Sequence, residues 1–138
     1  MPEKIRWSVQ FQVVDGPGVA KTDSIDVDSY EKTSLTVPLD GNSVLVTEPA
    51  LNTGDVQLVV IKADPCGPWL SYTTDGGTTA TLDAPHALVG TGAVGLMQAS
   101  APPKTLSFKA DTAKLAHDPV NKNATVSIVQ ILVGRKAT

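Results

Sequence analysis

The sequence predicts an all-β fold, an antiparallel β-sandwich or jelly roll of about 8–10 short strands that forms a single domain over residues 1–138. Short, β-branched apolar runs recur roughly every 8–12 residues between clusters of Gly, Pro, Asn and Asp, as strands and turns do in such folds. Almost no stretch shows the 3.6-residue apolar period of an amphipathic helix. A chain of 138 residues also has the size of one domain.

The central strand is predicted at Val56–Ala63, which reads VQLVVIKA. Six of its eight residues are apolar, so neither face keeps the polar alternation that contact with water requires. Turn signals stand on both sides, Asn52–Asp55 before it and Asp64-Pro65 after it, and the run is too short for a stable helix. We therefore expect a strand that is covered on both faces, with the other strands arranged around it.

The clearest alternation of apolar and polar residues lies at Lys4–Val14. The apolar residues occupy the odd positions, Ile5, Trp7, Val9, Phe11 and Val13. A period of two predicts a long strand with one dry face and one solvent-exposed face. The turn signal Asp15–Gly18 ends it.

Three weaker strands are predicted before the central one. The first lies around Ser24–Asp28, and the second at Lys32–Leu39, where the alternation returns. Pro38 places this second strand at a sheet edge or at a strand end, because proline cannot donate a ladder hydrogen bond. The third, Ser43–Thr47, follows the turn signal Asp40-Gly41-Asn42.

The second half of the chain begins with a predicted hairpin. Trp69–Thr74 and Thr78–Leu82 face each other across Asp75-Gly76-Gly77, where glycine supplies positive φ. Two further short strands are expected at His86–Val89 and Ala93–Gln98, with glycines where neighbouring backbone comes close.

The C-terminal region ends in a longer strand. Leu106 and Phe108 mark a short strand before it, and the polar loop that follows suits one helical turn at Thr112–Ala116. The last strand is predicted at Ala124–Val133. Apolar residues occupy both of its phases, which predicts either a bulge near Ile128 or burial on both faces.

Charge and composition exclude several classes of protein. The net charge is −3, the pI is near 5.2, and the eleven basic residues are scattered, so we expect no nucleic-acid partner. No apolar segment approaches the roughly 20 residues of a membrane helix, so we expect no membrane partner. Met1–Lys4 runs directly into a strand pattern, so we expect no signal peptide, and a location in a cytoplasm or in a particle assembled there.

One stretch matches a cofactor motif in its letters. Gly90–Gly95 reads GTGAVG and follows the apolar Ala87–Val89, as GxGxxG follows a strand in dinucleotide-binding proteins. That site needs a helix at the second glycine within a βαβ unit. Pro102-Pro103 would stop such a helix after about ten residues, and no βαβ pattern surrounds it. We therefore predict a glycine-bent strand or hairpin and no cofactor.

The residues that could carry other chemistry are isolated. His86 and His117 are the two histidines, and the neighbouring Asp83 and Asp118 have no zinc-ligand spacing with them. Cys66 is the single cysteine, which excludes an internal disulfide and a thiolate cluster. No GxSxG nucleophile motif is present. We expect no catalytic residue, no cofactor-binding residue and no metal ligand, and hence no enzyme.

Acidic residues gather at one place, Asp23, Asp26 and Asp28. Asp26 and Asp28 would share one strand face, and two carboxylates there could hold Ca²⁺, although the glycine and the final glutamate of an EF-hand loop are missing. A solvated acidic strand edge, which discourages aggregation, is the other interpretation of the same residues and the one we favour.

The short turn Thr74–Thr79 and the chain end Ile131–Thr138 resemble those of small tailed-phage virion proteins of the head-decoration and accessory type. The resemblance extends over the whole chain. It implies a non-enzymatic structural protein that decorates or stabilises a capsid or tail surface. It also implies a homo-oligomer, commonly a trimer, that binds itself and other structural proteins in a virion assembled in the host cytoplasm.

The alternative function is a carbohydrate-binding, lectin-like β-sandwich module. Trp69 and Tyr72 would grip the sugar, and the acids Asp23–Asp28 would form a calcium-assisted site. This alternative requires the two aromatic rings to be exposed together on one flat face.

Overall fold

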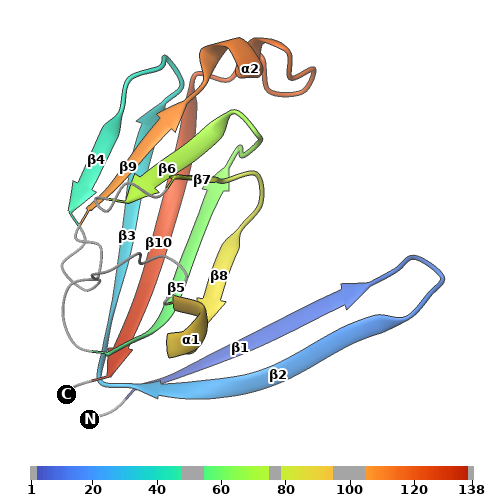
Figure 1. Cartoon of the computed structure of the whole chain (residues 1–138), viewed down its shortest axis with the longest axis vertical. Coiled ribbons are helices and arrows are strands. Elements are labelled where there is room, and N and C mark those ends of the chain that lie inside the picture. Colours follow the sequence, from blue (N-terminus) through green and yellow to red (C-terminus); the bar gives the residue numbers. More distant parts are fainter. Residues whose placement is uncertain (1–2, 48–54, 75–78, 95–104, 137–138) are drawn as a thin grey trace.

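The computed structural model describes residues 3–47, 55–74, 79–94 and 105–136. In these ranges the chain forms ten strands and two short helices (Figure 1). The strands are β1 (Glu3–Gln12), β2 (Gly18–Val27), β3 (Ser29–Pro38), β4 (Val44–Thr47), β5 (Asp55–Asp64), β6 (Leu70–Thr74), β7 (Thr79–Thr81), β8 (His86–Val89), β9 (Thr105–Ala110) and β10 (Val126–Lys136). The helices are α1 (Thr91–Val94) and α2 (Thr112–Ala116).

Strands β3 to β10 form two four-stranded sheets, in the orders β3-β10-β5-β8 and β4-β9-β6-β7. All the described pairs are antiparallel. β3 pairs with β10, β4 with β9, β5 with β8 and β6 with β7. This nesting of early strands with late ones is the topology of an eight-stranded jelly roll. The predicted all-β class is therefore confirmed, and the strand order is that of the jelly roll.

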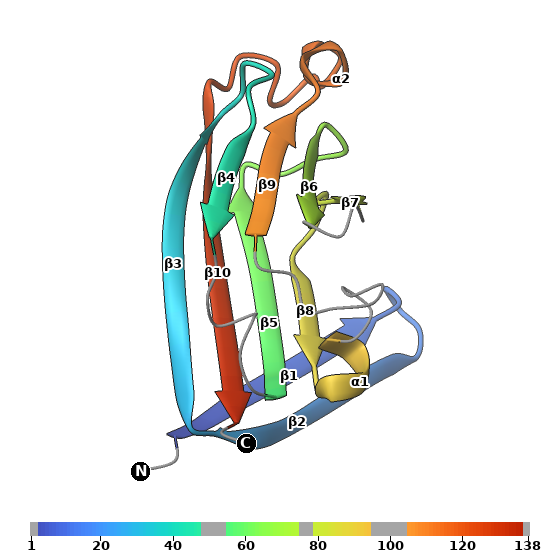
Figure 2. The same cartoon turned by 60° about the vertical axis from the view of Figure 1, so that its left-hand side comes forward.

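β1 and β2 form a separate two-stranded sheet, which we call the arm (residues 3–27). The arm leaves the lower end of the jelly roll in both views and projects away from the two main sheets (Figures 1 and 2). Only Asp28 separates β2 from β3, so the base of the arm is fixed close to the jelly roll.

The two strands of the arm were predicted unequally well. The strand at Lys4–Val14 is confirmed as β1, with half-buried and exposed side chains alternating along it. The partner expected around Ser24–Asp28 is a much longer strand, β2, which pairs with β1 along its whole length. Most of β2 is exposed, so its side chains lack the apolar alternation by which a strand is found in a sequence.

The core lies between the two four-stranded sheets. β10 contributes Val129 and Ile131, and β9 contributes Leu106 and Phe108, all with 0% of the side chain exposed. Trp69, which stands just before β6, is also buried in this cluster. Burial of these apolar side chains is the main favourable term in the stability of the jelly roll.

β5 is an interior strand, and the predicted cover on both faces holds in its first half only, because Lys62 in the second half is exposed. Leu58 and Val59 point to opposite faces, and both are almost fully buried. On the outer face Leu58 pairs with Gly134 of β10. A Cβ atom at Gly134 would lie 2.9 Å from Cδ1 of Ile5 and 3.1 Å from Cγ1 of Val27. The base of the arm therefore packs where β10 carries no side chain.

The last strand differs from the prediction. It runs from Val126 to Lys136, and its register against β5 shifts between Gly134 and Arg135, not near Ile128. Ile128 is 42% exposed, so this part of the strand is not buried on both faces either. On the outward-facing side of the strand, Gly134 is buried, because the base of the arm packs there.

Several local predictions are confirmed. β6 and β7 form the predicted hairpin, whose turn residues 75–78 lie outside the described ranges. Pro38 ends β3, which is an edge strand. α2 coincides with the predicted helical turn. It begins at Asp111, whose carboxylate accepts hydrogen bonds from the backbone N–H groups of Ala113 and Lys114.

Replacing Gly134 with valine should separate the base of the arm from the sheet. The added side chain would overlap Ile5 and Val27, and overpacking of this kind lowers the free energy of unfolding by about 1–3 kcal/mol. Urea denaturation of G134V checks this. The control is Gln130→Val, which adds an apolar side chain on the outer face of the same strand four residues before Gly134. Equal stability of G134V and the wild type would contradict the packing described here.

Candidate functional site

The two faces of the arm differ in chemistry. Residues that are directly opposite in an antiparallel pair share a face. One face, which we call the apolar face, carries Ile5, Trp7, Val9 and Phe11 of β1 with their partners Ile25, Asp23, Lys21 and Val19 of β2. The other face is polar and includes the Lys4–Asp26 ion pair, with 3.7 Å between Nζ and Oδ1. The predicted strand with one apolar and one polar face is formed, but the apolar face lies on the arm outside the core and is exposed at its tip, so it is not dry there.

The apolar face becomes more exposed toward the tip of the arm. Ile5 and Ile25 at the base are half-buried, whereas Phe11 is 70% exposed and Val19 is 72% exposed. Val13 continues the face beyond β1 and is 62% exposed. Large apolar side chains that are exposed side by side indicate a surface that another molecule covers.

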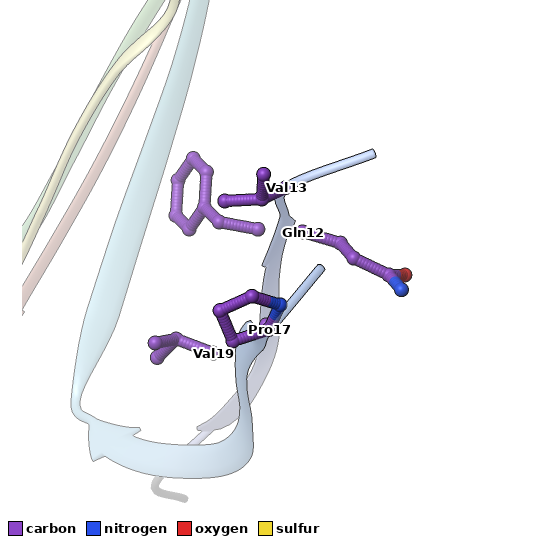
Figure 3. A pocket seen from close by; sticks show the side chains of 6 residues that line it. Gln12, Val13, Pro17 and Val19 are labelled. Atoms are coloured by element: carbon purple, nitrogen blue, oxygen red, sulfur yellow. The ribbon is translucent and has the colours of Figure 1, made fainter. Parts of the chain in front are cut away.

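These side chains line a shallow groove of about 380 Å³ at the tip. Figure 3 shows Val13, Pro17 and Val19 on the same side of the hairpin, with the side chain of Gln12 turned away from them. The tip is held in shape by backbone hydrogen bonds from Val13 N–H to the carbonyl oxygen of Pro17 (2.9 Å) and from Gly16 N–H to that of Val13 (2.8 Å). The tip therefore presents a shaped apolar surface.

Two charged residues interrupt the apolar face in its middle. Lys21 lies opposite Val9, and Asp23 lies opposite Trp7. Nζ of Lys21 is 5.9 Å from the centre of the Trp7 ring, within the range of a cation–π contact. The indole N–H of Trp7 is buried and has no acceptor among the described residues.

The aromatic residues of the sugar-binding alternative are in the core. Trp69 is 1% exposed and Tyr72 is 4% exposed. Nε1 of Trp69 donates a hydrogen bond of 2.8 Å to Oδ2 of Asp118. The hydroxyl of Tyr72 lies 2.8 Å from Nδ1 of His86. The flat, exposed aromatic face that this alternative requires is therefore not formed by Trp69 and Tyr72.

The remaining candidate residues do not form a site within the described part of the chain. Asp26 lies on the polar face of the arm and Asp23 on the apolar face, while Asp28 lies past the end of β2, so Asp26 and Asp28 do not share a face of that strand. Among the described residues, no three His, Cys, Asp or Glu side chains are placed to hold a metal ion. His117 caps the end of α2 and is exposed. Sγ of Cys66 donates to the carbonyl oxygen of Asp83 at 3.5 Å.

In the described part of the GxGxxG stretch, residues 90–94, the chain forms neither a glycine-bent strand nor a hairpin. Gly90 adopts a φ of +90° and turns the chain into α1, where Val94 N–H donates to the carbonyl oxygen of Gly90. Ala93 and Val94 are thus helical, whereas the sequence predicts a strand at Ala93–Gln98; residues 95–98 lie outside the described ranges. β8 and β9, the described strands before and after α1, lie in different sheets, so they do not form the βαβ unit of a dinucleotide site.

Comparisons with known proteins give no relative: no family model, no curated protein and no solved structure matches this chain. Neither of the two helices in the described ranges has the length and the apolar character needed to cross a membrane. The surface that most needs an explanation is the apolar face of the arm, which the sequence predicts as the dry face of a strand and which is exposed at its tip.

The stability of the fold should depend on pH through the ionisation of Asp118. Its hydrogen bond from Trp69, followed by those from Asn121 and Val120, lowers the pKa of this carboxyl to about 2. Because the pKa is lower in the folded state, the stabilisation is complete above the ordinary value of 3.8 and is lost as the pH falls toward 2. Thermal melting of Asp118→Asn should show a Tm below that of the wild type at pH 6, with a smaller difference at pH 2. A difference that is equal at both pH values would contradict this assignment.

Proposed function

We propose that this protein is a non-enzymatic structural protein that assembles with copies of itself through the arm, as a component that decorates or stabilises a capsid or tail surface in a virion. The observation that carries the proposal is the exposed apolar face of the arm, which ends in Phe11, Val13 and Val19.

The arm is poorly explained as a part of an isolated molecule. A two-stranded hairpin by itself is marginally stable in water, and three or more strands or a packed face are normally needed. The jelly roll packs against the base of the arm, where Gly134 lies against Ile5 and Val27. A second surface that covers the outer half would remove Phe11 and Val19 from water and stabilise the hairpin at the same time.

The fold and the arrangement of polar groups support a structural role. The eight-stranded jelly roll recurs in viral capsid proteins and in lectins. The one histidine that is partly covered, His86, is held by the Tyr72 hydroxyl, and burial raises the pKa of Tyr72. These side chains are engaged in packing and hydrogen bonds in the core. Because a fold serves many functions, the proposal depends on the arm and not on the jelly roll alone.

Replacing Phe11 with aspartate should abolish assembly. We expect the wild type to form an oligomer, and F11D to raise the dissociation constant by at least about 30-fold, as loss of a central aromatic contact does. Size-exclusion chromatography with light scattering gives the mass of each species and the number of subunits.

The matched control is Gln10→Asp, which places the same charge on the polar face of the arm one residue away. It should assemble as the wild type does. A wild type that stays monomeric at the highest concentration reached would contradict the proposed function, as would an F11D variant that assembles normally.

A further inference from the structure

The receiving surface for the arm can be identified from strand register. Every second residue of β10 points to the outer side of the β3-β10-β5-β8 sheet, away from the core, and the first two of these, Val126 and Ile128, are 44% and 42% exposed. Asp64 of β5 is directly opposite Ile128, and Lys62 is directly opposite Gln130. These five residues form what we call the outer face.

The outer face has three rows, counted from the start of β10. The first row is Val126, the second is Ile128 with Asp64, and the third is Gln130 with Lys62. Below them the chain's own arm begins to cover the sheet, since Leu132 lines a groove together with Lys4 and Ile5, and Gly134 contacts Ile5. Three rows are therefore available to another molecule.

The outer half of the arm also has three rows on its apolar face. From the tip these are Phe11 with Val19, Val9 with Lys21, and Trp7 with Asp23. The fourth row, Ile5 with Ile25, is half-buried at the base. Rows on both surfaces are two residues apart along a strand, so their spacing is the same, roughly 6.5–7 Å.

We propose that the outer half of the arm of one copy lies on the outer face of a second copy, with its tip toward the start of β10. This inference rests on the proposed function and on the matching rows of the two surfaces. In this register Phe11 and Val19 cover Val126, Lys21 faces Asp64, and Asp23 faces Lys62.

The handedness of the chain allows this arrangement. Val13 N–H bonds to Pro17 O, so the odd residues of β1 bond toward β2 and carry the apolar side chains. Leu39 N–H bonds to Thr125 O, so the odd residues of β10 bond toward β3, and the outward even residues bond toward β5. For L-residues, these hydrogen-bond directions determine on which side the neighbouring strand lies when each face is viewed from outside. Turning the arm over onto the sheet with its tip toward Val126 places β1 over β10 and β2 over β5.

Charge selects this register over its neighbours. If the arm moved by one row toward the third row of the outer face, Lys21 would lie over Lys62. If it moved by one row in the opposite direction, Asp23 would lie over Asp64. Like charges brought together at an interface disfavour those registers. None of the four residues forms an ion pair with another described residue of its own chain.

The occupant is a second copy because the arm cannot reach its own outer face in this way. One residue, Asp28, joins β2 to β3, and the arm points away from the jelly roll (Figure 1). Each copy offers one arm and one outer face, so the contact is head-to-tail. Such contacts close into a ring or continue as a chain.

Charge reversal tests the register. Lys21→Glu and Asp64→Lys should each weaken self-association at least about tenfold, because each brings like charges together. The double variant K21E/D64K restores the opposite charges and should associate within about threefold of the wild type. A mixture of the two single variants should also associate, since each arm then finds a matching outer face on the other variant. Sedimentation velocity over a concentration series measures all four.

The control is Arg6→Glu, which makes the same change of charge on the polar face of the arm and should leave association unchanged. A second pair, Asp23→Lys with Lys62→Glu, repeats the design at the third row in case a variant at Asp64 does not fold. If F11D blocks association while the single charge variants behave as R6E does, the register is wrong and the assembly function stands. If the wild type does not associate at all, both are wrong.

Discussion

The pairing of β10 with β3 on one side and β5 on the other is the constraint on which the rest of the structure depends. One phase of β10 fills the core through Val129 and Ile131, which are fully buried. The other phase faces outward and changes along the strand, from exposed Val126 to Gly134, where the base of the arm packs. The same strand thus closes the jelly roll, anchors the arm and provides the surface that we assign to a second copy.

The fold class could be predicted because the strands of the jelly roll obey local rules. Val56–Ala63 is apolar at six of its eight positions and becomes the interior strand β5, and Pro38 ends the edge strand β3. The turn at Asp40-Gly41-Asn42, where Gly41 has a φ of +88°, and the helical turn at Thr112–Ala116 depend on residues close together in the chain, so they are visible in the sequence. Strand order depends on contacts between distant residues, which is why the sequence left sandwich and jelly roll open.

The arm could not be predicted from the same rules. Alternation at Ile5, Trp7 and Phe11 shows that one face avoids water, but it does not show what covers that face. The sequence predicts a dry face, whereas Phe11 and Val13 toward the tip of the arm are exposed. The prediction for β10 was wrong for a related reason, because apolar residues on both of its faces indicated either a bulge near Ile128 or burial on both faces. The outward-facing residues of β10 instead contact the base of the arm at Gly134 and form an exposed surface at Ile128.

The most direct test of this account is amide hydrogen exchange of the arm over a dilution series. If another copy covers the apolar face, the protection of the amides in β1 and β2 should fall as the oligomer dissociates. The amides of β9 and β10, which depend on the core of a single chain, should keep their protection. Exchange in the arm that is the same in the oligomer and in the diluted monomer would contradict the claim that a second copy covers it.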